Sequence, residues 1–250
     1  MPHRRHHYGW LADSPDDRDH LYAAPRVRGL PTRVDLRLEC PPVYNQGPLG
    51  SCTANAIAGA IQFEQLKRHR HAAVPARLFI YYNERSTMGM TGFDCGAPNR
   101  DGIKTVAKQG VCDELVWSYD ITKFREEPPH SCYAAASRHR VGEYQRLAQS
   151  LEQLRGCLAD GHPFVFGFLI YESFEHQAVI TSGHAAMPAA TEKQLGGHAV
   201  LGVGYDDVNQ RFLVRNSWGT NWGLRGYFTL PYAYLTDQDL ASDFWTIRLV

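Results

Sequence analysis

The spacing of hydrophobic and polar positions changes near residue 160 of this 250-residue chain. Before that point, apolar side chains recur with the period of a helix, and stretches containing Gly and Pro separate the segments. This pattern predicts helices over residues 52–69, 78–85, 102–109 and 151–159. After residue 163, shorter apolar runs predict strands over residues 164–171, 198–205, 211–215, 226–230 and 244–249.

Helices first and strands afterwards favour an α+β fold. We expect a mainly helical half that spans approximately residues 52–160 and a mainly β half that spans approximately residues 161–250, with a cleft between the two halves. Residues 176–196 contain Gly183, Pro188 and several alanines, so we expect a long loop bordering this cleft. The longest apolar run, residues 164–171, is too short for a membrane helix and fits a buried strand.

Residues 1–29 differ from the rest, because they are polar and rich in turn-forming residues. They are too short and too polar to fold alone. They nevertheless carry apolar side chains that a solvated tail would not need, namely Tyr8, Trp10, Leu11, Leu21 and Tyr22. We interpret residues 1–29 as a leader or short prosegment. The alternatives are a disordered tail and a segment packed on the outer face of the protein.

Charge and composition exclude several classes of partner. Basic and acidic residues balance at 26 each, which indicates no general attraction to nucleic acid or to an anionic membrane. No apolar stretch of a secretory signal follows the basic N-terminus, so we expect a cytoplasmic protein, or a secreted one if a leader was removed.

The cysteine pattern bears on metal binding and on redox state. The six cysteines are Cys40, Cys52, Cys95, Cys112, Cys132 and Cys157. No two of them form a C-x-x-C pair, which argues against a structural zinc site. We expect mostly reduced thiols, no metal and no cofactor.

One cysteine stands at the start of the first predicted helix. A loop rich in Gly and Pro ends at Ser51, and the helical pattern begins at Cys52. The first turn of a helix carries unpaired backbone N–H groups and the positive end of the helix dipole, and both favour a thiolate. Taken alone, however, a free cysteine is more often a small buried hydrophobic residue than a nucleophile.

Two later segments contain groups that would activate such a cysteine. His198 follows a glycine pair and opens an apolar strand, whereas most other histidines stand among polar residues. Asn216 follows the predicted strand 211–215 and precedes Trp218. A Cys/His pair needs a third group to fix the imidazole tautomer, and an amide oxygen can accept the proton on the far ring nitrogen. Trp218 would cover that hydrogen bond and exclude water.

Together these segments resemble the papain-like cysteine peptidases, and the layout is most similar to the bacterial xylellain-type branch. Four motifs occur in the family's order: Gln46 six residues before Cys52, the Gly-Ser-Cys helix start, His198-Ala199-Val200, and Asn216-Ser217-Trp218-Gly219. Residues 30–37 look like the start of the family's mature domain, so the resemblance covers about residues 30–250. The distance from the cysteine to the asparagine is slightly longer than usual, which predicts an insertion.

The resemblance implies a helical subdomain and an antiparallel β-barrel-like subdomain with the active-site cleft between them. It implies hydrolysis of peptide bonds by a thiolate–imidazolium pair of Cys52 and His198 through an acyl-enzyme, with Asn216 orienting the imidazole. The Gln46 side chain and the Cys52 backbone N–H would donate to the oxyanion. The residues that would line the substrate cleft are Gly96, Ala97, Gly197 and Ala199.

The same resemblance implies a peptide or protein substrate and endopeptidase action. The resemblance also implies a preference for substrates with a bulky apolar side chain two residues before the scissile bond. Papain-like zymogens thread a prosegment through the cleft, so the resemblance also implies autoinhibition by residues 1–29.

The chain departs from the family at positions beside the nucleophile. Leu49 and Asp94 stand where most members carry a disulfide-bonded cysteine pair, and Thr53 replaces the usual aromatic residue. Neither change removes a catalytic group. Two alternative functions remain: an amidase or transglutaminase-like acyltransferase of the same Cys/His/Asn chemistry, and a non-catalytic binding module on the same fold. The Gln46 loop and the Asn216-Ser217-Trp218-Gly219 motif favour the peptidase.

Overall fold

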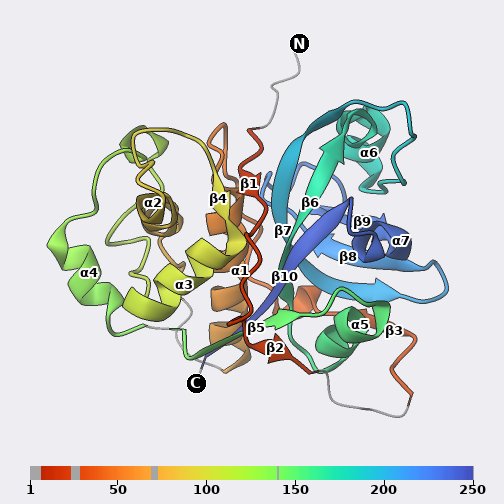
Figure 1. Ribbon diagram of the computed structural model, residues 1–250, viewed down its shortest axis with the longest axis horizontal. Helices are drawn as coiled ribbons and strands as arrows, with labels where there is room; N and C mark the ends of the chain where they lie inside the picture. The colour runs from red at the N-terminus through yellow and green to blue at the C-terminus, as the bar shows by residue number, and fades with distance from the viewer. Residues whose placement is uncertain (1–6, 24–28, 69–72, 140, 250) are drawn as a thin grey trace.

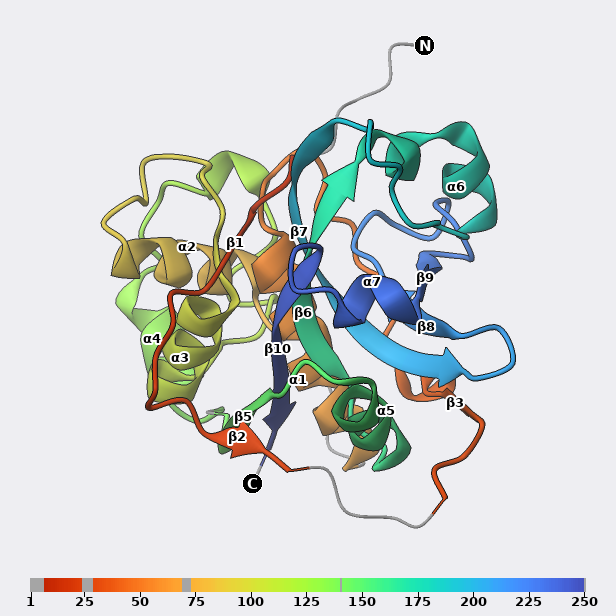
Figure 2. The same cartoon turned by 45° about the vertical axis from the view of Figure 1, so that its right-hand side comes forward.

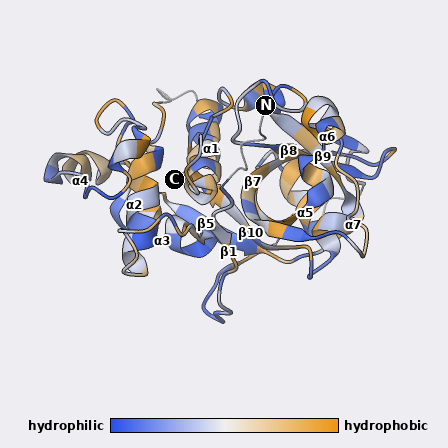
Figure 3. Cartoon of the chain, turned by 90° about the horizontal axis from the view of Figure 1, so that it is seen from above, coloured by the Kyte–Doolittle hydropathy of each residue, from blue (hydrophilic) through white to orange (hydrophobic). Residues whose placement is uncertain are grey.

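The computed structural model describes residues 7–23, 29–68, 73–139 and 141–249. Its elements form two halves on either side of one central helix (Figure 1). Helices α2 (Arg77–Thr87), α3 (Asn99–Gln109) and α4 (His130–Ala136) form one half. The other half is a curved sheet, and α1 (Cys52–Lys67) lies between the two when the molecule is seen from above (Figure 3).

In the described part of the chain, eight strands form the main sheet in the order β2-β5-β10-β6-β7-β8-β9, with β3 paired to β7. Their bounds are Leu21–Tyr22 (β2), Arg33–Asp35 (β3), Glu143–Leu147 (β5), Phe164–Tyr171 (β6), Gln194–Asp206 (β7), Arg211–Arg215 (β8), Tyr227–Pro231 (β9) and Ala241–Arg248 (β10). Strand β2 runs parallel to β5. Every later pair in the sheet order, from β5-β10 to β8-β9, is antiparallel. The helices on this side of the molecule are α5 (Leu151–Ala159), α6 (Gln177–Ser182) and α7 (Tyr232–Thr236). The observed architecture is the α+β fold that the papain-like resemblance implied.

Helix α1 is buried on all sides from Cys52 to Glu64, which is typical of an interior helix rather than a surface one. Small side chains allow the sheet to approach it. A Cβ atom added at Gly59 would lie 3.5 Å from Arg215 Nε and 3.7 Å from a Leu201 methyl carbon. The middle of α1 thereby packs closely against β7 and β8.

Aromatic rings fill the inner face of the sheet. Phe164, Phe166 and Phe168 alternate along β6 and are fully buried. Phe166 stacks on Phe244 of β10, with 5.4 Å between the ring centroids. Pairing of β6 with β7 places Phe168 opposite His198, so the packing of these rings fixes the position of that histidine along the sheet.

The N-terminal segment, residues 7–23, is part of this fold and runs along the junction of the two halves (Figure 2). Strand β1 (Trp10–Leu11) pairs in parallel with β4 (Ala97–Pro98), and β2 extends the main sheet beside β5. Of the expected apolar anchors, Trp10 and Tyr22 are buried and Tyr8 is half-buried. Leu11 and Leu21 are exposed.

The predicted bounds of α5, β6 and β8 agree with the structure. Helix α1 ends at Lys67, two residues before the predicted end, and residue 69 lies outside the described residues. The prediction of a loop over residues 176–196 is wrong in part, because it contains α6 and the start of β7. Only Val179 is buried in α6, so the segment lacks the apolar periodicity from which a helix could be predicted. Strand β5 was not predicted, since it pairs with β10 about a hundred residues later.

No helix within the described ranges is long and apolar enough to cross a membrane.

Candidate active site

Cys52 is the first residue of α1 and is fully buried. The backbone N–H of Ala199, on β7, donates to Cys52 Sγ at 3.4 Å, so helix and sheet meet at the thiol. Burial raises the pKa of this thiol to about 11, although backbone N–H groups of Ala199 and Gly9 act in the opposite direction. The helix start was expected to favour a thiolate. In the arrangement observed, with the N-terminal segment in place, burial acts against this preference.

His198 directly precedes Ala199 on β7, so the same strand brings the imidazole and the thiol to one place. The Nε2 atom of His198 lies 2.9 Å from Asn216 Oδ1. Because an amide oxygen only accepts, this contact assigns the proton to Nε2. Asn216 is held in turn, since its backbone N–H donates to Gly226 O at 2.9 Å. The ring of Trp218 stacks on the imidazole, with 4.7 Å between centroids and 26° between planes.

Gln46 is fully buried, and its amide group is fixed from both ends. The Oε1 atom accepts a hydrogen bond from Ser217 Oγ at 2.6 Å. The Nε2 atom donates to Leu49 O at 2.9 Å and lies 3.3 Å from His7 O. Ser217 follows Asn216, so the Gln46 loop and the asparagine segment support each other.

The N-terminal segment passes directly over this site. Gly9 O accepts a hydrogen bond from Ala97 N at 2.8 Å. A Cβ atom at Gly96 would stand 1.9 Å from Gly9 O, and one at Gly9 would stand 1.7 Å from Gly50 O. Gly96 also has a φ of +72°, where a side chain is strained. Three glycines therefore let the segment approach the helical half of the site.

The next residue, Trp10, lies in a pocket on the sheet side, and the residue is only 8% exposed. A Cβ atom at Gly167 would stand 1.9 Å from its indole Cε2, and one at Gly197 would stand 2.5 Å from Cε3. A side chain at either position would therefore collide with the indole. The indole can lie directly against the sheet because β6 and β7 each carry a glycine here.

Tyr8 lies beside the stacked rings of His198 and Trp218. Its ring centroid lies 6.3 Å from those of both His198 and Trp218, and its hydroxyl donates to Glu175. Beside Tyr8 is a cavity of about 910 Å³ whose rim carries Glu172, Glu175, His176 and Lys193. The N-terminal segment thus separates Cys52 from solvent on several sides.

All the residues expected to line the cleft contact either this segment or the thiol, namely Gly96, Ala97, Gly197 and Ala199. Sequence reasoning missed Gly167, Gly50 and Ser217. Glycines inside or next to predicted elements were the available signal for the first two, because such glycines mark close approach of another backbone or ligand. For Ser217 the signal was its place between Asn216 and Trp218.

The described residues contain no group of three or more His, Cys, Asp or Glu side chains placed to hold a metal ion. The arrangement offers three groups instead. They are the buried thiol of Cys52, the imidazole of His198 oriented by the Asn216 amide, and the Gln46 amide, whose N–H faces the carbonyl oxygen of His7.

Comparison with known proteins points the same way. Residues 30–242 match the model of the papain family cysteine protease. The chain is 47% identical over 215 residues to an uncharacterized peptidase C1-like protein of Acanthamoeba polyphaga mimivirus, covering 82% of this chain and 69% of that protein. It is 25% identical over 238 residues to cathepsin J of Mus musculus, covering 86% of this chain and 64% of cathepsin J.

Solved structures give a similar picture. Xylellain, a cysteine protease from Xylella fastidiosa, superposes with a TM-score of 0.92 at 43% identity, over 98% of this chain and 97% of xylellain. The digestive procathepsin L 3 of Tenebrio molitor shares the fold, with a TM-score of 0.74 at 19% identity, over 92% of this chain and 74% of that one.

Proposed function

Because the chain belongs to the papain family of cysteine proteases, we propose that Cys52 is its nucleophile, His198 its general acid and base, and Asn216 the group that orients the imidazole. The chain is a cysteine peptidase, and these residues are the ones that fit the roles. The observation that carries the proposal is the chain of contacts from Cys52 Sγ through β7 to the His198–Asn216 hydrogen bond.

In the proposed reaction, the Cys52 thiol gives its proton to His198, and the sulfur attacks a peptide carbonyl carbon. His198 then protonates the leaving amine, which departs as the acyl-enzyme forms. Water, deprotonated by His198, attacks the thioester and releases the second product. The Asn216 amide oxygen keeps the imidazole in the tautomer that these transfers require.

The Gln46 side chain is the proposed donor to the negative oxygen that forms on the attacked carbonyl, together with the Cys52 backbone N–H. Supporting this role, Gln46 Nε2 lies 3.3 Å from the carbonyl oxygen of His7, a peptide carbonyl brought to the site by the N-terminal segment. Ser217 fixes the amide before any substrate arrives.

The substrate is proposed to be an extended peptide with a bulky apolar side chain two residues before the scissile bond. The Trp10 side chain is buried against Gly167 and Gly197, which supports room for a large side chain in the cleft. We further propose endopeptidase action. The N-terminal segment enters the site at His7 and leaves it beyond Leu11, so the site accommodates a chain that continues in both directions.

Residues 1–29 are proposed to inhibit the enzyme by occupying this cleft. The described part, residues 7–23, covers Cys52 and fills the Trp10 pocket. Removal of residues 1–29 should raise kcat/KM for a small peptide substrate, and a peptide of residues 7–23 should inhibit the shortened enzyme competitively. Equal activity of the two proteins, both folded by circular dichroism, would contradict inhibition.

An acyltransferase or amidase would share the acyl-enzyme and differ only in the acceptor. The experiment that tests the proposed function therefore compares an unfolded protein substrate with small amides. Cys52→Ala and His198→Ala, in the protein lacking residues 1–29, should each abolish cleavage of the unfolded protein. Full cleavage by folded Cys52→Ala would refute the proposed nucleophile.

A further inference from the structure

A cavity of about 910 Å³ lies beside His7 and Tyr8, at the end of the cleft where the N-terminal segment enters. The Tyr8 ring at its edge lies 6.3 Å from the ring of His198, which is the proposed proton donor to the leaving amine. The Trp10 pocket, assigned to the side chain two residues before the scissile bond, is reached on the other side of Gly9. The cavity is therefore placed to receive the residues that follow the scissile bond.

The N-terminal segment already places two polar side chains against carboxylates in this cavity. The Tyr8 hydroxyl donates to Glu175 Oε1, and His7 Nδ1 lies 2.8 Å from Asp94 Oδ2. Burial and then the hydrogen bond to Glu175 raise the pKa of Tyr8, so its hydroxyl keeps its proton and Glu175 is the acceptor. A chain that lies in the cleft thus meets hydrogen-bond acceptors here at two successive residues.

Glu175 is held at a fixed position relative to His198. It ends the short 3-10 helix η3 (Glu172–Glu175), whose Phe174 is only 3% exposed. The Phe174 ring packs against Trp218, with 5.9 Å between centroids, and Trp218 stacks on His198. The carboxylate of Glu175 is therefore positioned by the same aromatic rings that cover the imidazole.

The lining of the cavity is acidic once the segment has left. Its remaining charged or titratable groups are three carboxylates, one ammonium and one imidazole, from Asp94, Glu172, Glu175, Lys193 and His176. Lys193 adjoins Glu172, since Glu172 N–H donates to Lys193 O and Lys193 N–H donates to Glu172 Oε2. Even with His176 protonated, one negative charge remains, and it would attract a cation.

We propose that this cavity selects peptides with a cationic side chain, Lys or Arg, at the first or second residue after the scissile bond, with Glu175 as its main acceptor. This inference rests on the proposed peptidase function and names a feature of its substrate.

The chemistry of the acceptor favours a cation over a neutral donor. A carboxylate accepts several hydrogen bonds, and those from an ammonium or guanidinium group are stronger than those from a neutral amide. Glu175 is half-buried, so the gain is limited by solvent, and we expect roughly a tenfold preference. A preference based on charge must also weaken as salt screens it.

The kinetic test uses the full-length chain and two peptides that differ only in carrying Arg or Gln at the two positions after the scissile bond. Both peptides compete for the same uncovered enzyme, so the extent to which the segment covers the cleft cancels from the ratio of their kcat/KM values. Arg should be preferred roughly tenfold at about 20 mM salt and only a few-fold at about 500 mM salt.

Variants assign this preference to one carboxylate. Glu175→Gln should lower kcat/KM for the Arg peptide towards that for the Gln peptide, and Glu175→Lys should favour a matching Glu peptide over the Arg peptide. Glu152→Gln makes the same change of charge at an exposed position of α5 and should keep the wild-type ratio. A ratio near one, a ratio insensitive to salt, or an Arg preference retained in Glu175→Lys would each overturn the proposal.

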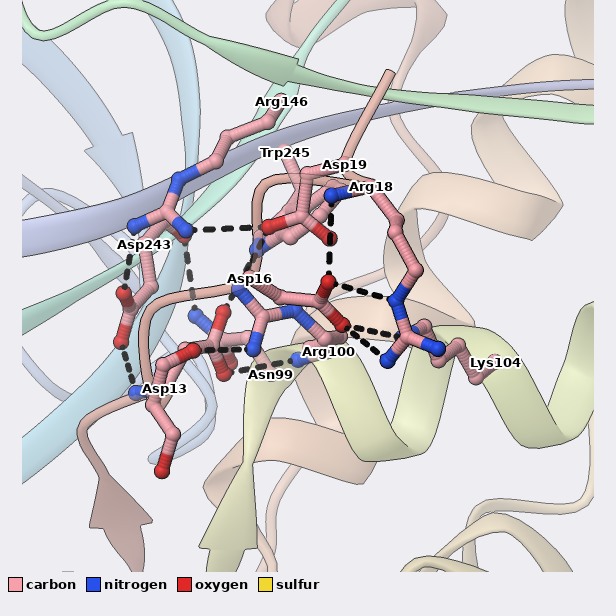
Figure 4. Close-up of polar contacts among 11 residues, drawn as sticks. Asp13, Asp16, Arg18, Asp19, Asn99, Arg100, Lys104, Arg146, Asp243 and Trp245 are labelled. Carbon is pink, nitrogen blue, oxygen red and sulfur yellow. Dashed lines mark hydrogen bonds and ion pairs between the residues drawn. The ribbon is translucent and has the colours of Figure 1, made fainter. Parts of the chain in front are cut away.

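A second measurement needs no catalysis, because the segment is also held away from the cavity. Residues 13–19 dock where α3, β5 and β10 meet (Figure 4). The backbone N–H of Asp13 donates to Asp243 Oδ2 at 2.8 Å, and its carboxylate accepts from Trp245 Nε1 at 2.9 Å. A substitution at Tyr8 therefore changes the side chain offered to the cavity while these contacts keep the segment attached.

In full-length Cys52→Ala, hydrogen exchange of the backbone amides of residues 9–11 reports how well the segment lies in the cleft. Tyr8→Lys should give roughly tenfold greater protection than Tyr8→Glu, and adding Glu175→Lys should reverse that order. Equal protection, or an order that Glu175→Lys leaves unchanged, would contradict a cavity that selects cations. If neither peptide is cleaved but the expected order of protection holds, the proposed function fails and the preference of the cavity stands.

Discussion

The carboxylate of Asp94 accepts the backbone N–H of Gly50 at 3.0 Å, two residues before Cys52. Asp94 and Leu49 occupy the positions where most papain-family members would have a disulfide. The same carboxylate accepts the Tyr81 hydroxyl and pairs with His7. The hydrogen bonds of the Asp94 carboxylate thus connect the loop before Cys52 to the helical half without a covalent bond.

Asp94→Ala should therefore lower stability by about 1–3 kcal/mol, because it leaves the Gly50 N–H and the buried Tyr81 hydroxyl without their acceptor. Thermal unfolding measures the effect, with Asp239→Ala, at an exposed position, as the control. An unchanged Tm for Asp94→Ala would mean that water replaces the carboxylate without loss.

Reduction should leave the fold intact. The cysteines of the described residues are all free. Tm in dithiothreitol should equal Tm without it, and activity should rise or hold. Cys112 and Cys132 are neighbours, since burial and then the Cys132 thiol raise the pKa of Cys112 to about 12. A Tm several degrees lower on reduction would identify a bridge, and this pair would be the first to examine.

Gln46→Ala should lower kcat by about 10²–10³ and change KM much less, because its hydrogen bond to the reacting oxygen strengthens only in the transition state. Steady-state kinetics of proteins lacking residues 1–29 test this. Ser217→Ala, which frees the Gln46 amide without removing it, should cause a smaller loss. A change confined to KM would contradict the role of Gln46.

Asn216→Ala should reduce turnover less than Cys52→Ala does, since the amide orients the imidazole and transfers no proton. The same kinetic assay compares the two. Loss as complete as that of Cys52→Ala would mean that His198 cannot work in any other orientation.

Trp10→Ala in the full-length chain should raise basal kcat/KM by about 10- to 100-fold, because the segment loses a buried indole and its docked population falls. Leu11→Ala is the matched control, since that neighbouring side chain is exposed. If both variants had wild-type activity, the Trp10 pocket would not hold the segment in place.

The candidate site residues could be selected from the sequence because their signals are local. Cys52 begins α1, Asn216 directly follows β8, and His198 opens the apolar part of β7, while the bounds of β6 and β8 follow from continuous apolar runs. The papain-like fold followed from the order of these motifs.

The contacts of the N-terminal segment could not be predicted, because each joins residues that are far apart in the sequence. The backbone N–H of Asp13 donates to Asp243 Oδ2, 230 residues further along the chain, and nothing next to either residue indicates the other as its partner. Gly167 interrupts an apolar strand, but only the position of Trp10 explains why it carries no side chain.

The covered position of Cys52 has a chemical consequence. Peroxides and alkylating agents react with thiolates and need access to the sulfur. Burial beneath Gly9 denies that access to Cys52 and also raises the pKa of its thiol. The covered protein is therefore a form in which the proposed nucleophile is shielded from oxidising surroundings, and the same uncovering that would admit a peptide would expose the sulfur to oxidation.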